Sequence, residues 1–502
     1  RGRRVSLPRR VLIANRGEIS VRIARTCHAA EVEVVAVYTD VDAVSPHTLV
    51  AGRSIQVDSY VDAEALCEAA RLSGCDAVHP GYGFLSENPS FVTAVTAAGL
   101  TFIGPPAAAM EIMGSKTRAR AAMREAGVPV VPGTEPGTAE ELMAAAGEIG
   151  YPVFLKAVAG GGGKGMSIVT DAERLERVYR QASDEAAKSF GDGAVYLEKL
   201  VERPRHIEIQ IFADTHGNTV ALGERECSIQ RRHQKIIEEA PSPAVSPELR
   251  ARMSTAAVAA AEAVGYVGAG TVEFLLDTSG EFFFLEMNTR LQVEHPVTEW
   301  ITGLDLVRLQ LEVAGGAALP PEALEPTFVG HAIECRIYAE DPAAGHLPQA
   351  GRLLLMREPS GPGVRVDAAL AEGQQIGVHF DPMLAKISCW ARDRSAAVAR
   401  MREALRRYVL LGVQTNLDYL QAILTVPAFA DGDLTTAFLD EHMADWPPSE
   451  KVAPLAMAAT VLADRYGAGR AGRVDARATD PLAGDPWQTL GRFRMGGGGE
   501  AC

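Results

Sequence analysis

The sequence lacks long apolar runs, paired cysteine motifs and an excess of positive charge. No stretch approaches the roughly 20 apolar residues that a membrane span requires, so we expect no transmembrane helix. Seven cysteines are scattered without a Cys-x-x-Cys pair, which fits neither a disulfide framework nor a zinc site. The formal net charge of −15 argues against a nucleic-acid-binding protein, because phosphate contacts require a basic face.

The cysteine usage is typical of a reducing compartment, so we expect a cytoplasmic protein. The stretch from Arg1 to Arg10 carries five arginines but has no apolar segment or cleavage site of a secretory signal. We interpret it as a solvated arm. The alternative is a remnant of an organelle-targeting segment, which would place the protein in the mitochondrial matrix.

The chain contains an ordered succession of strand and helix patterns, and 502 residues suffice for two or three subdomains. In the first hundred residues we predict strands at 10–14, 32–38 and 77–78, separated by helices at 19–30 and 63–72. This alternation predicts a parallel sheet. Ligands of such sheets bind beyond the carboxyl ends of the strands, where residues 15–18 and 81–84 fall. Neither segment has the full Gly-x-Gly-x-x-Gly spacing, so no dinucleotide is expected.

The later part of the chain indicates antiparallel strands. Residues 207–222 and 272–286 alternate in polarity and flank an Ala-rich helix at 247–264. Short strands follow Gly330, and helices are predicted at 395–408, with Ser395 as N-cap, and at 415–424. The predicted class is therefore α/β, becoming α+β in the C-terminal part.

A glycine run, Gly160–Gly163 followed by Lys164 and Gly165, separates two apolar runs. Bare backbone of this kind lets several N–H groups converge on phosphate oxygens. It is not a Walker loop, because Gly165 stands where Ser or Thr would bind magnesium. A flexible hairpin tip is the alternative. Lys116 and Lys156 supply two nearby ammonium groups, which favours a mobile flap that closes over ATP.

Residues 284–295 alternate in polarity and predict one extended strand with a polar face. That face carries Glu286, Asn288, Arg290, Gln292 and Glu294. A solvated outer face is the alternative interpretation. Glu273, on a strand predicted beside this one, weakens that alternative, because Glu273, Glu286 and Asn288 together offer the oxygen ligands that Mg²⁺ or Mn²⁺ prefers.

The segment 226–235 holds four basic or titratable side chains in an otherwise acidic chain. These are Arg231, Arg232, His233 and Lys235. Alone, such a segment is most often a solvated loop. Beside a phosphate cleft it is better interpreted as an electrostatic clamp for substrate anions.

Five segments together resemble the biotin carboxylase component of biotin-dependent carboxylases. They are residues 13–19, 79–88, 160–166, 230–241 and 286–299. The resemblance runs from about residue 8 to 446 and implies the ATP-grasp fold. The implied organisation is an N-terminal domain at 1–114, an ATP-grasp domain at 115–330 with a lid at about 128–202, a C-terminal domain at 331–446, and a linker or partly disordered tail at 447–502.

The resemblance implies an ATP-dependent ligase that carboxylates biotin with bicarbonate through carboxyphosphate, the first half-reaction of an acyl-CoA carboxylase. ATP and Mg²⁺ or Mn²⁺ are the implied cofactors, and biotin is a substrate on a carrier. It assigns ATP contacts to Lys116, Lys156, Gly161, Gly162, Gly163, Gly165, Met166, Glu198, Lys199, Val201, His206, Gln230, His233, Lys235, Glu273 and Glu286. It assigns the metal to Glu273, Glu286 and Asn288.

The resemblance also implies the reacting centre. Catalysis falls to Lys235, Arg290, Glu294 and Arg336, with Glu294 as general base toward bicarbonate. Bicarbonate and biotin would contact Arg290, Gln292, Val293, Glu294, Arg336 and Tyr82. A buried ion pair is the alternative reading of Arg336.

The sequence lacks the Ala-Met-Lys-Met biotinylation motif, so we expect biotin on a carrier protein or domain. The implied partners are that carrier, a carboxyltransferase subunit and a second copy in a homodimer or larger assembly, without nucleic acid or membrane. Residues 484–487 and 491–494 resemble the region that follows biotin carboxylase in α subunits, so the chain is interpreted as a truncated α subunit. The rival functions are an ATP-grasp ligase of carbamoyl-phosphate type and a non-catalytic nucleotide-binding subunit.

Overall fold

The computed structural model describes residues 7–158, 166–232 and 234–446. The chain divides into two units, Arg1–Trp446 and Pro447–Cys502, and every described residue belongs to the first. The tail predicted at 447–502 thus lies outside the described residues. Among those residues, no helix is long and apolar enough to cross a membrane.

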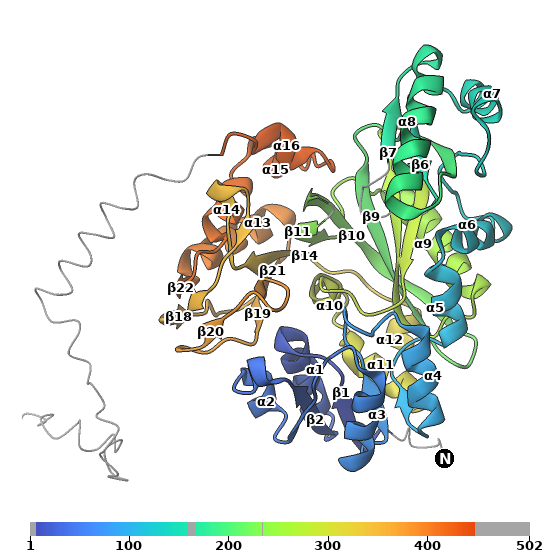
Figure 1. Cartoon of the computed structure of the whole chain (residues 1–502). Coiled ribbons are helices and arrows are strands. Elements are labelled where there is room, and N and C mark those ends of the chain that lie inside the picture. The colour runs from blue at the N-terminus through green and yellow to red at the C-terminus, as the bar shows by residue number, and fades with distance from the viewer. Residues whose placement is uncertain (1–6, 159–165, 233, 447–502) are drawn as a thin grey trace, which may run out of the picture. The chain divides into compact units, whose positions relative to one another are not determined.

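The N-terminal part is a five-stranded parallel sheet in the order β3-β2-β1-β4-β5 (Figure 1, blue). Its elements are β1 (Arg10–Ile13), α1 (Gly17–Ala29), β2 (Glu33–Tyr38), α2 (Pro46–Val50), β3 (Ser54–Gln56), α3 (Ala63–Leu72), β4 (Ala77–His79), α4 (Pro89–Ala97) and β5 (Thr101–Phe102). Leu12 packs into one hydrophobic cluster and its neighbours Val11 and Ile13 into another, so both faces of the sheet are covered. The predicted parallel sheet is confirmed.

A small module follows, built on the three-stranded antiparallel sheet β7-β6-β8. The elements of this stretch are α5 (Ala107–Met113), α6 (Lys116–Glu125), α7 (Ala139–Ile149), β6 (Val153–Ala157), β7 (Met166–Val169), α8 (Ala172–Phe190) and β8 (Val195–Lys199). Leu142, Leu155, Leu175 and Leu197 form its own small core. The glycine run falls between paired strands β6 and β7, but residues 159–165 lie outside the described part.

The remaining strands join into one eight-stranded sheet in the order β13-β12-β9-β10-β11-β14-β21-β19, with every pairing antiparallel. These strands are β9 (Arg205–Ala213), β10 (Thr219–Arg231), β11 (Gln234–Ala240), β12 (Gly268–Leu276), β13 (Phe282–Asn288), β14 (His331–Tyr338), β19 (Val364–Ala368) and β21 (Met383–Ala391). The pairing of β11 with β14 makes the sheet continuous across residue 330. The predicted antiparallel strands are confirmed.

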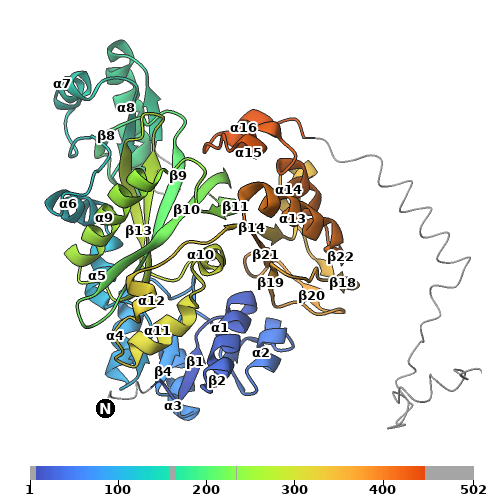
Figure 2. The same cartoon turned by 180° about the vertical axis from the view of Figure 1, so that it is seen from behind.

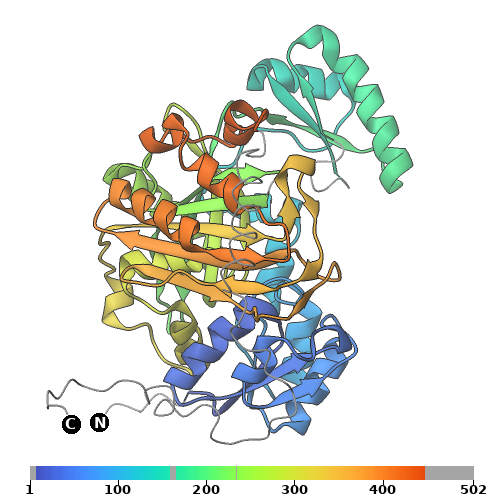
Figure 3. The same ribbon diagram turned by 90° about the vertical axis from the view of Figure 1, so that its left-hand side faces the viewer.

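Helices cover this sheet. They are α9 (Pro247–Ala263), α10 (His295–Thr302), α11 (Leu306–Ala314), α12 (Pro321–Leu324), α13 (Arg394–Arg407), α14 (Leu417–Ile423), α15 (Pro427–Asp431) and α16 (Phe438–His442). Helix α11 lies beside α1 of the N-terminal part (Figure 2), and α13 lies over β21 (Figure 3, orange). Short strand pairs complete the C-terminal part: β15 (Glu340–Asp341) with β16 (Leu347–Pro348), β17 (Gly351–Arg352) with β20 (Gln375–Ile376), and β18 (Leu355–Arg357) with β22 (Val409–Leu411).

Two local predictions are wrong. Helix α13 begins at Arg394, and Asp393 rather than Ser395 is its N-cap, with a carboxylate that accepts a hydrogen bond from the Ala396 N–H at 2.9 Å. The strand predicted at 284–295 ends at Asn288. Pro296 in the first turn of α10 favours a helix start there, so the chain leaves the sheet before Glu294.

Candidate active site

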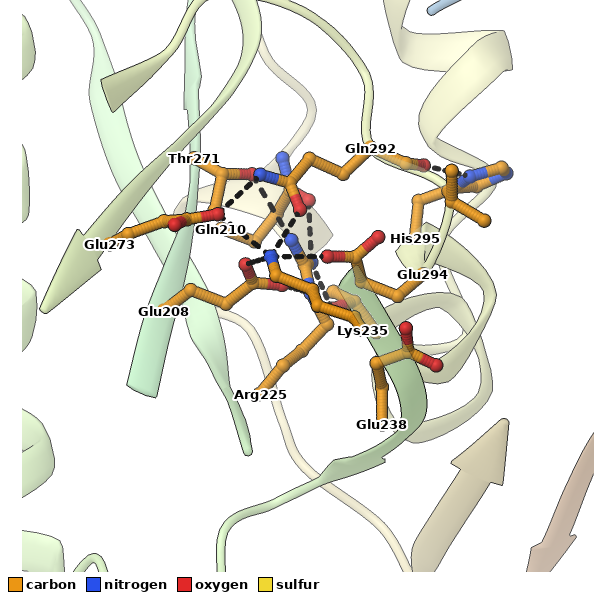
Figure 4. Close-up of polar contacts among 12 residues, drawn as sticks. Glu208, Gln210, Arg225, Lys235, Glu238, Thr271, Glu273, Gln292, Glu294 and His295 are labelled. Atoms are coloured by element: carbon orange, nitrogen blue, oxygen red, sulfur yellow. Dashed lines mark hydrogen bonds and ion pairs between the residues drawn. The ribbon is translucent and has the colours of Figure 1, made fainter. Parts of the chain in front are cut away.

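Lys235 lies at the centre of a cluster of buried charged side chains (Figure 4). Its Nζ donates to Glu208 Oε2 at 2.5 Å, Glu273 Oε1 at 2.7 Å and Glu294 Oε1 at 2.7 Å. It also reaches Gln292 Oε1 at 3.0 Å. Burial alone would lower the pKa of Lys235, but the three carboxylates outweigh it and raise that pKa well above its ordinary value. The ammonium therefore stays charged.

Arg225 contacts this cluster through Glu208, and its side chain is fully buried. Its Nε bonds to Glu208, and its Nη1 donates to Gln210 Oε1 at 2.7 Å and to Thr298 Oγ1 at 2.9 Å. Thr298 belongs to α10, while Glu208 and Gln210 belong to β9. Arg225 thus ties the sheet to the helix that follows Glu294.

Glu294 is held between two cations. Lys235 bonds to one carboxylate oxygen, and Arg336 Nη2 donates to the other at 2.9 Å. Burial opposes ionisation, yet Lys235 and Arg336 outweigh it and hold the pKa of Glu294 well below its usual range. Glu294 is therefore a carboxylate at neutral pH.

Arg336 is shared between two acids. Its Nε donates to Glu238 Oε1 at 2.6 Å, opposite the bond from Nη2 to Glu294. Burial raises the pKa of Glu238 to about 7, against the attraction of Arg336. Ile333, Cys335 and Ile337 point to the other side of β14, into the C-terminal core, as the alternation predicts. The structure thus shows the buried ion pair that was the alternative interpretation of Arg336, and its catalytic role stays a prediction.

The three predicted metal ligands come together on β12 and β13. Glu273 and Glu286 are direct cross-strand partners, and Asn288 Nδ2 donates to Glu273 Oε1 at 3.0 Å. Removal from water, followed by repulsion from Glu273, raises the pKa of Glu286. A divalent cation would relieve that repulsion. Two carboxylates and an amide oxygen therefore fit Mg²⁺ or Mn²⁺.

His206 and Gln230 line the same region. His206 Nε2 bonds to Glu273 Oε2 at 2.8 Å, and its Nδ1 lies 3.4 Å from Gln230 Nε2. Burial would lower the pKa of His206, but Glu273 outweighs it and raises that pKa. His206, Glu208 and Glu273 also place one ligand atom each within 4.8 Å of one another.

The predicted bicarbonate anchor is the loop from Arg290 to Glu294. Arg290 Nη2 donates to Asn288 Oδ1 at 2.8 Å, and Gln292 Nε2 donates to Glu273 Oε1 at 3.1 Å. The carbonyl oxygen of Val293 accepts from Lys386 Nζ at 2.5 Å. Tyr82 lies at the same end, with its ring centroid 5.7 Å from Lys386 Nζ. The loop is thus bonded both to Glu273 of β12 and to Lys386 of β21.

The small module contributes a second cation–carboxylate group. Lys156 on β6 and Arg120 on α6 both bond to Glu198 on β8. Lys116 is exposed at the start of α6, Met166 is exposed at the start of β7, and Val201 is half-buried after β8.

The side chain of Lys199 has another partner. Its Nζ donates to the carbonyl oxygens of Gly150 and Tyr151, at 2.8 and 3.2 Å, so it braces the module. The predicted phosphate contacts Gly161, Gly162, Gly163 and Gly165 and the predicted contact His233 lie outside the described residues.

Sequence reasoning missed several members of the site. Glu208, Glu238 and Lys386 are buried and bond to predicted site residues, and the buried Arg225 bonds in turn to Glu208. One sequence signal could have indicated them: polar or charged residues at alternate positions of an otherwise apolar strand, as Glu208 and Gln210 are in the range 207–211. Such residues are almost never fully buried unless paired.

Family profiles match three successive parts of the chain. Residues 8–110 match "Biotin carboxylase, N-terminal domain", residues 115–322 match "Carbamoyl-phosphate synthase L chain, ATP binding domain", and residues 334–441 match "Biotin carboxylase C-terminal domain".

Individual proteins agree with the profiles. A biotin carboxylase of Halalkalibacterium halodurans is 48% identical over 443 residues, covering 87% of this chain and 98% of that protein. The mitochondrial methylcrotonoyl-CoA carboxylase subunit alpha of Dictyostelium discoideum is 46% identical over 499 residues, covering 97% of this chain and 70% of that protein. For the mouse subunit, the chain spans 63% of its length, at 47% identity over 449 residues and 88% of this chain.

A solved structure gives the same result. The biotin carboxylase domain dimer of Hydrogenobacter thermophilus 2-oxoglutarate carboxylase, in complex with MgADP, ADP and bicarbonate, has a TM-score of 0.82 and 44% identity. It covers 89% of this chain and 100% of that one. The ATP-grasp fold that the resemblance implied is therefore confirmed, and this chain belongs to the biotin carboxylase family of biotin-dependent carboxylases.

Proposed function

We propose that this chain is an ATP-dependent ligase that carboxylates biotin with bicarbonate. The observation that carries the proposal is the bonded row Lys235–Glu294–Arg336, which adjoins the oxygen cluster of Glu273, Glu286 and Asn288. The Lys235 end of this row, next to Glu273, suits a complex of a nucleotide with a metal ion. The Arg336 end suits a small anion and the uncharged ureido ring of biotin. The family relationship supplies the substrates: a solved relative is described with MgADP and bicarbonate bound.

The first step joins bicarbonate to the γ-phosphoryl group of ATP. A bicarbonate oxygen attacks the γ-phosphorus, the bond to the β–γ bridging oxygen breaks, and ADP leaves. Glu294 accepts the bicarbonate proton, because its two cationic neighbours keep it ionised beforehand. Lys235 and Arg290 offset the negative charge gathered at the anion. The product is carboxyphosphate.

The second step transfers CO₂ to biotin. Carboxyphosphate divides into CO₂ and phosphate, and the phosphate takes the proton from biotin N1. The ring nitrogen then bonds to CO₂. Arg336 stabilises the negative charge that appears on the ureido oxygen by a charge-assisted hydrogen bond.

Glu273, Glu286 and Asn288 would hold the divalent cation. When bound, it neutralises phosphate charge and fixes the geometry of ATP. Lys116, Lys156 and the glycine run would contact the phosphates from the module side. Glu198, Lys199, Val201 and His206 would frame the nucleoside.

We propose a biotin carrier protein or domain and a carboxyltransferase as partners, in a homodimer or larger assembly. The relatives named as methylcrotonoyl-CoA carboxylase and pyruvate carboxylase subunits support a place in a two-step carboxylase. Because the final acceptor is bound by the carboxyltransferase, an acyl-CoA is the acceptor we propose by analogy with the first of these.

The test is ADP release from ATP with bicarbonate and Mg²⁺, with and without free biotin, for the wild-type chain and Glu294→Ala. We expect biotin to stimulate turnover, and we expect the variant to lose about 10²-fold or more of it, as for removal of a general base. Omitting Mg²⁺ should abolish turnover in both. Turnover indifferent to biotin would instead support an ATP-grasp ligase with another acceptor.

A further inference from the structure

We infer that Glu87 is a positioning residue that sets the guanidinium of Arg290 for bicarbonate. Glu87 belongs to the loop between β4 and α4, in the N-terminal part, and the mechanism above gives it no role. The inference rests on the proposed function, because Arg290 is taken as the bicarbonate anchor. The inference adds a contact to Arg290 from a residue of the N-terminal part, outside the eight-stranded sheet.

The carboxylate of Glu87 bridges two consecutive residues of the catalytic segment. Its Oε2 accepts from Arg290 Nε at 2.9 Å. Its Oε1 accepts from the Thr289 N–H at 2.9 Å and from Thr289 Oγ1 at 3.2 Å. Three contacts from one carboxylate fix both the backbone before Arg290 and the plane of its guanidinium.

The contacts leave one edge of the guanidinium facing away from Glu87. Nε is bound to Glu87, and Nη2 donates to Asn288 Oδ1 at 2.8 Å. The contact of Nη1 is a 3.4 Å approach to the carbonyl oxygen of Leu291. A planar anion can therefore be received at the Nη edge while Glu87 holds the Nε edge. If the Asn288 side-chain oxygen bound the metal ion instead of Arg290 Nη2, the bond from Glu87 to Nε would still hold the guanidinium in place.

The loop that carries Glu87 is itself held in place. Asn15 Nδ2 donates to the carbonyl oxygens of Pro80 and Tyr82, both at 2.7 Å. Ser86 beside Glu87 is buried, and Asn88 caps α4 by accepting from the Phe91 N–H at 3.1 Å. A carboxylate on such a loop loses little freedom when it binds Arg290, so the contact preorganises the anchor.

This arrangement predicts an effect on one substrate. Without the carboxylate, the Arg290 side chain has more conformations to choose from before bicarbonate binds, and the affinity for bicarbonate falls. The ATP contacts come from other residues, so the affinity for ATP stays. A merely structural role would instead change both affinities or the melting temperature.

The experiment measures KM for bicarbonate and for ATP by ADP release, without and with free biotin. The variants are Glu87→Gln and Glu87→Asp. The matched control is Glu68→Gln, which removes a similarly exposed acid on α3 that bonds to Arg71 of the same helix at 2.6 Å and to no predicted site residue. Melting temperatures are measured for all chains.

For Glu87→Gln we expect KM for bicarbonate to rise about tenfold, a loss typical of one hydrogen bond to a charged group. KM for ATP and the melting temperature should match those of Glu68→Gln, and Glu87→Asp, which keeps the charge but is shorter, should lie between. An unchanged KM for bicarbonate, or equal changes for both substrates, would overturn the inference. Absence of bicarbonate-dependent turnover in the wild-type chain would overturn the proposed function as well. Failure of the inference about Glu87 alone would instead leave the wild-type turnover intact.

Discussion

The ionisation states of the candidate site follow from pairing at the scale of single residues. Burial by itself would protonate Glu273 and Glu294 and neutralise Lys235. Their mutual contacts reverse each of these tendencies, so the pKa of each acid is lowered and that of Lys235 is raised. Burial prevails at other acids of the region: the pKa of Glu238 and that of Glu286 are raised, and so is the pKa of an acid on α1 whose cationic partner is more distant.

That acid is Glu18 of α1, whose side chain is buried and whose nearest cation, Lys386 Nζ, lies 3.5 Å away. Burial raises the pKa of Glu18 to about 7, against Lys386 and in the same direction as Asp367. In the unfolded chain it titrates near its ordinary value. Stability should therefore be highest at acidic pH for this group and be lost as pH rises from about 4.5 to about 7, by about 3 kcal/mol in total.

Glu18→Gln removes this titration while keeping the side chain's shape. We expect the melting temperature of the variant to fall less than that of the wild-type chain between pH 5.5 and pH 8, and the variant to be the more stable of the two at pH 8. Thermal unfolding at both pH values measures it. Parallel pH dependence of the two chains would contradict the assigned ionisation.

At the scale of elements, the segment that follows α6 is bonded through its backbone to strand β8 of the small module. The Thr134 N–H donates to the carbonyl oxygen of Leu197 at 2.9 Å, and the Lys199 N–H donates to that of Pro132 at 2.8 Å. These bonds place the segment around Gly133 against β8, next to Glu198. A Cβ at Gly133 would lie 2.4 Å from the carbonyl oxygen of Leu197, so glycine is required for this approach.

Gly133→Ala should therefore separate this segment from β8. We expect a loss of about 2 kcal/mol in the stability of the module, comparable to other forced local backbone shifts, and a higher KM for ATP because Glu198 moves. The control is Gly147→Ala inside α7, where a Cβ meets nothing within 4 Å. It should leave KM for ATP unchanged and stabilise the helix slightly. Equal kinetics for the two variants would refute the expectation.

At the scale of the whole described unit, Glu299 of α10 joins parts that are distant in sequence. It accepts from Arg22 Nη2 of α1 at 2.7 Å and from Arg365 Nη1 of β19 at 2.6 Å. It also accepts from the Leu306 N–H at the start of α11, at 2.8 Å. Helix α1 of the N-terminal part, helices α10 and α11, and the edge strand β19 of the eight-stranded sheet thus share one buried carboxylate.

Glu299→Gln would remove the carboxylate that Arg22 and Arg365 share, while Asp305 stays bonded to the first and Asp367 to the second. We expect a loss of about 2 kcal/mol, less than for a buried charge left with no partner. Calorimetry should show a clearly lower melting temperature. Glu312→Gln, which removes an i,i+4 pair with Arg308 on the surface of α11, should change stability by about 0.5 kcal/mol or less. Similar melting temperatures for both variants would argue against the joining role of Glu299.

The amino-acid sequence by itself determined the order of elements and most of the residue types of the site. Period-two and helical patterns are local, so the parallel sheet, the antiparallel strands and the flanks of the glycine run could be predicted. The same logic failed beyond Asn288, because the alternation of Arg290, Gln292 and Glu294 continues in a loop that is no longer extended.

Only the tertiary structure decided which charges meet. Lys235 and Glu294 are 59 residues apart, and Glu87 and Arg290 are 203 apart. No local pattern distinguishes Glu87 or Arg225 from other charged residues. Pairing across the eight-stranded sheet brings Lys235 to the buried acids, and the high energetic cost of leaving a buried charge unpaired then sets the ionisation of this cluster. The contact between Glu87 and Arg290 depends on how the loop before α4 packs against the segment after β13.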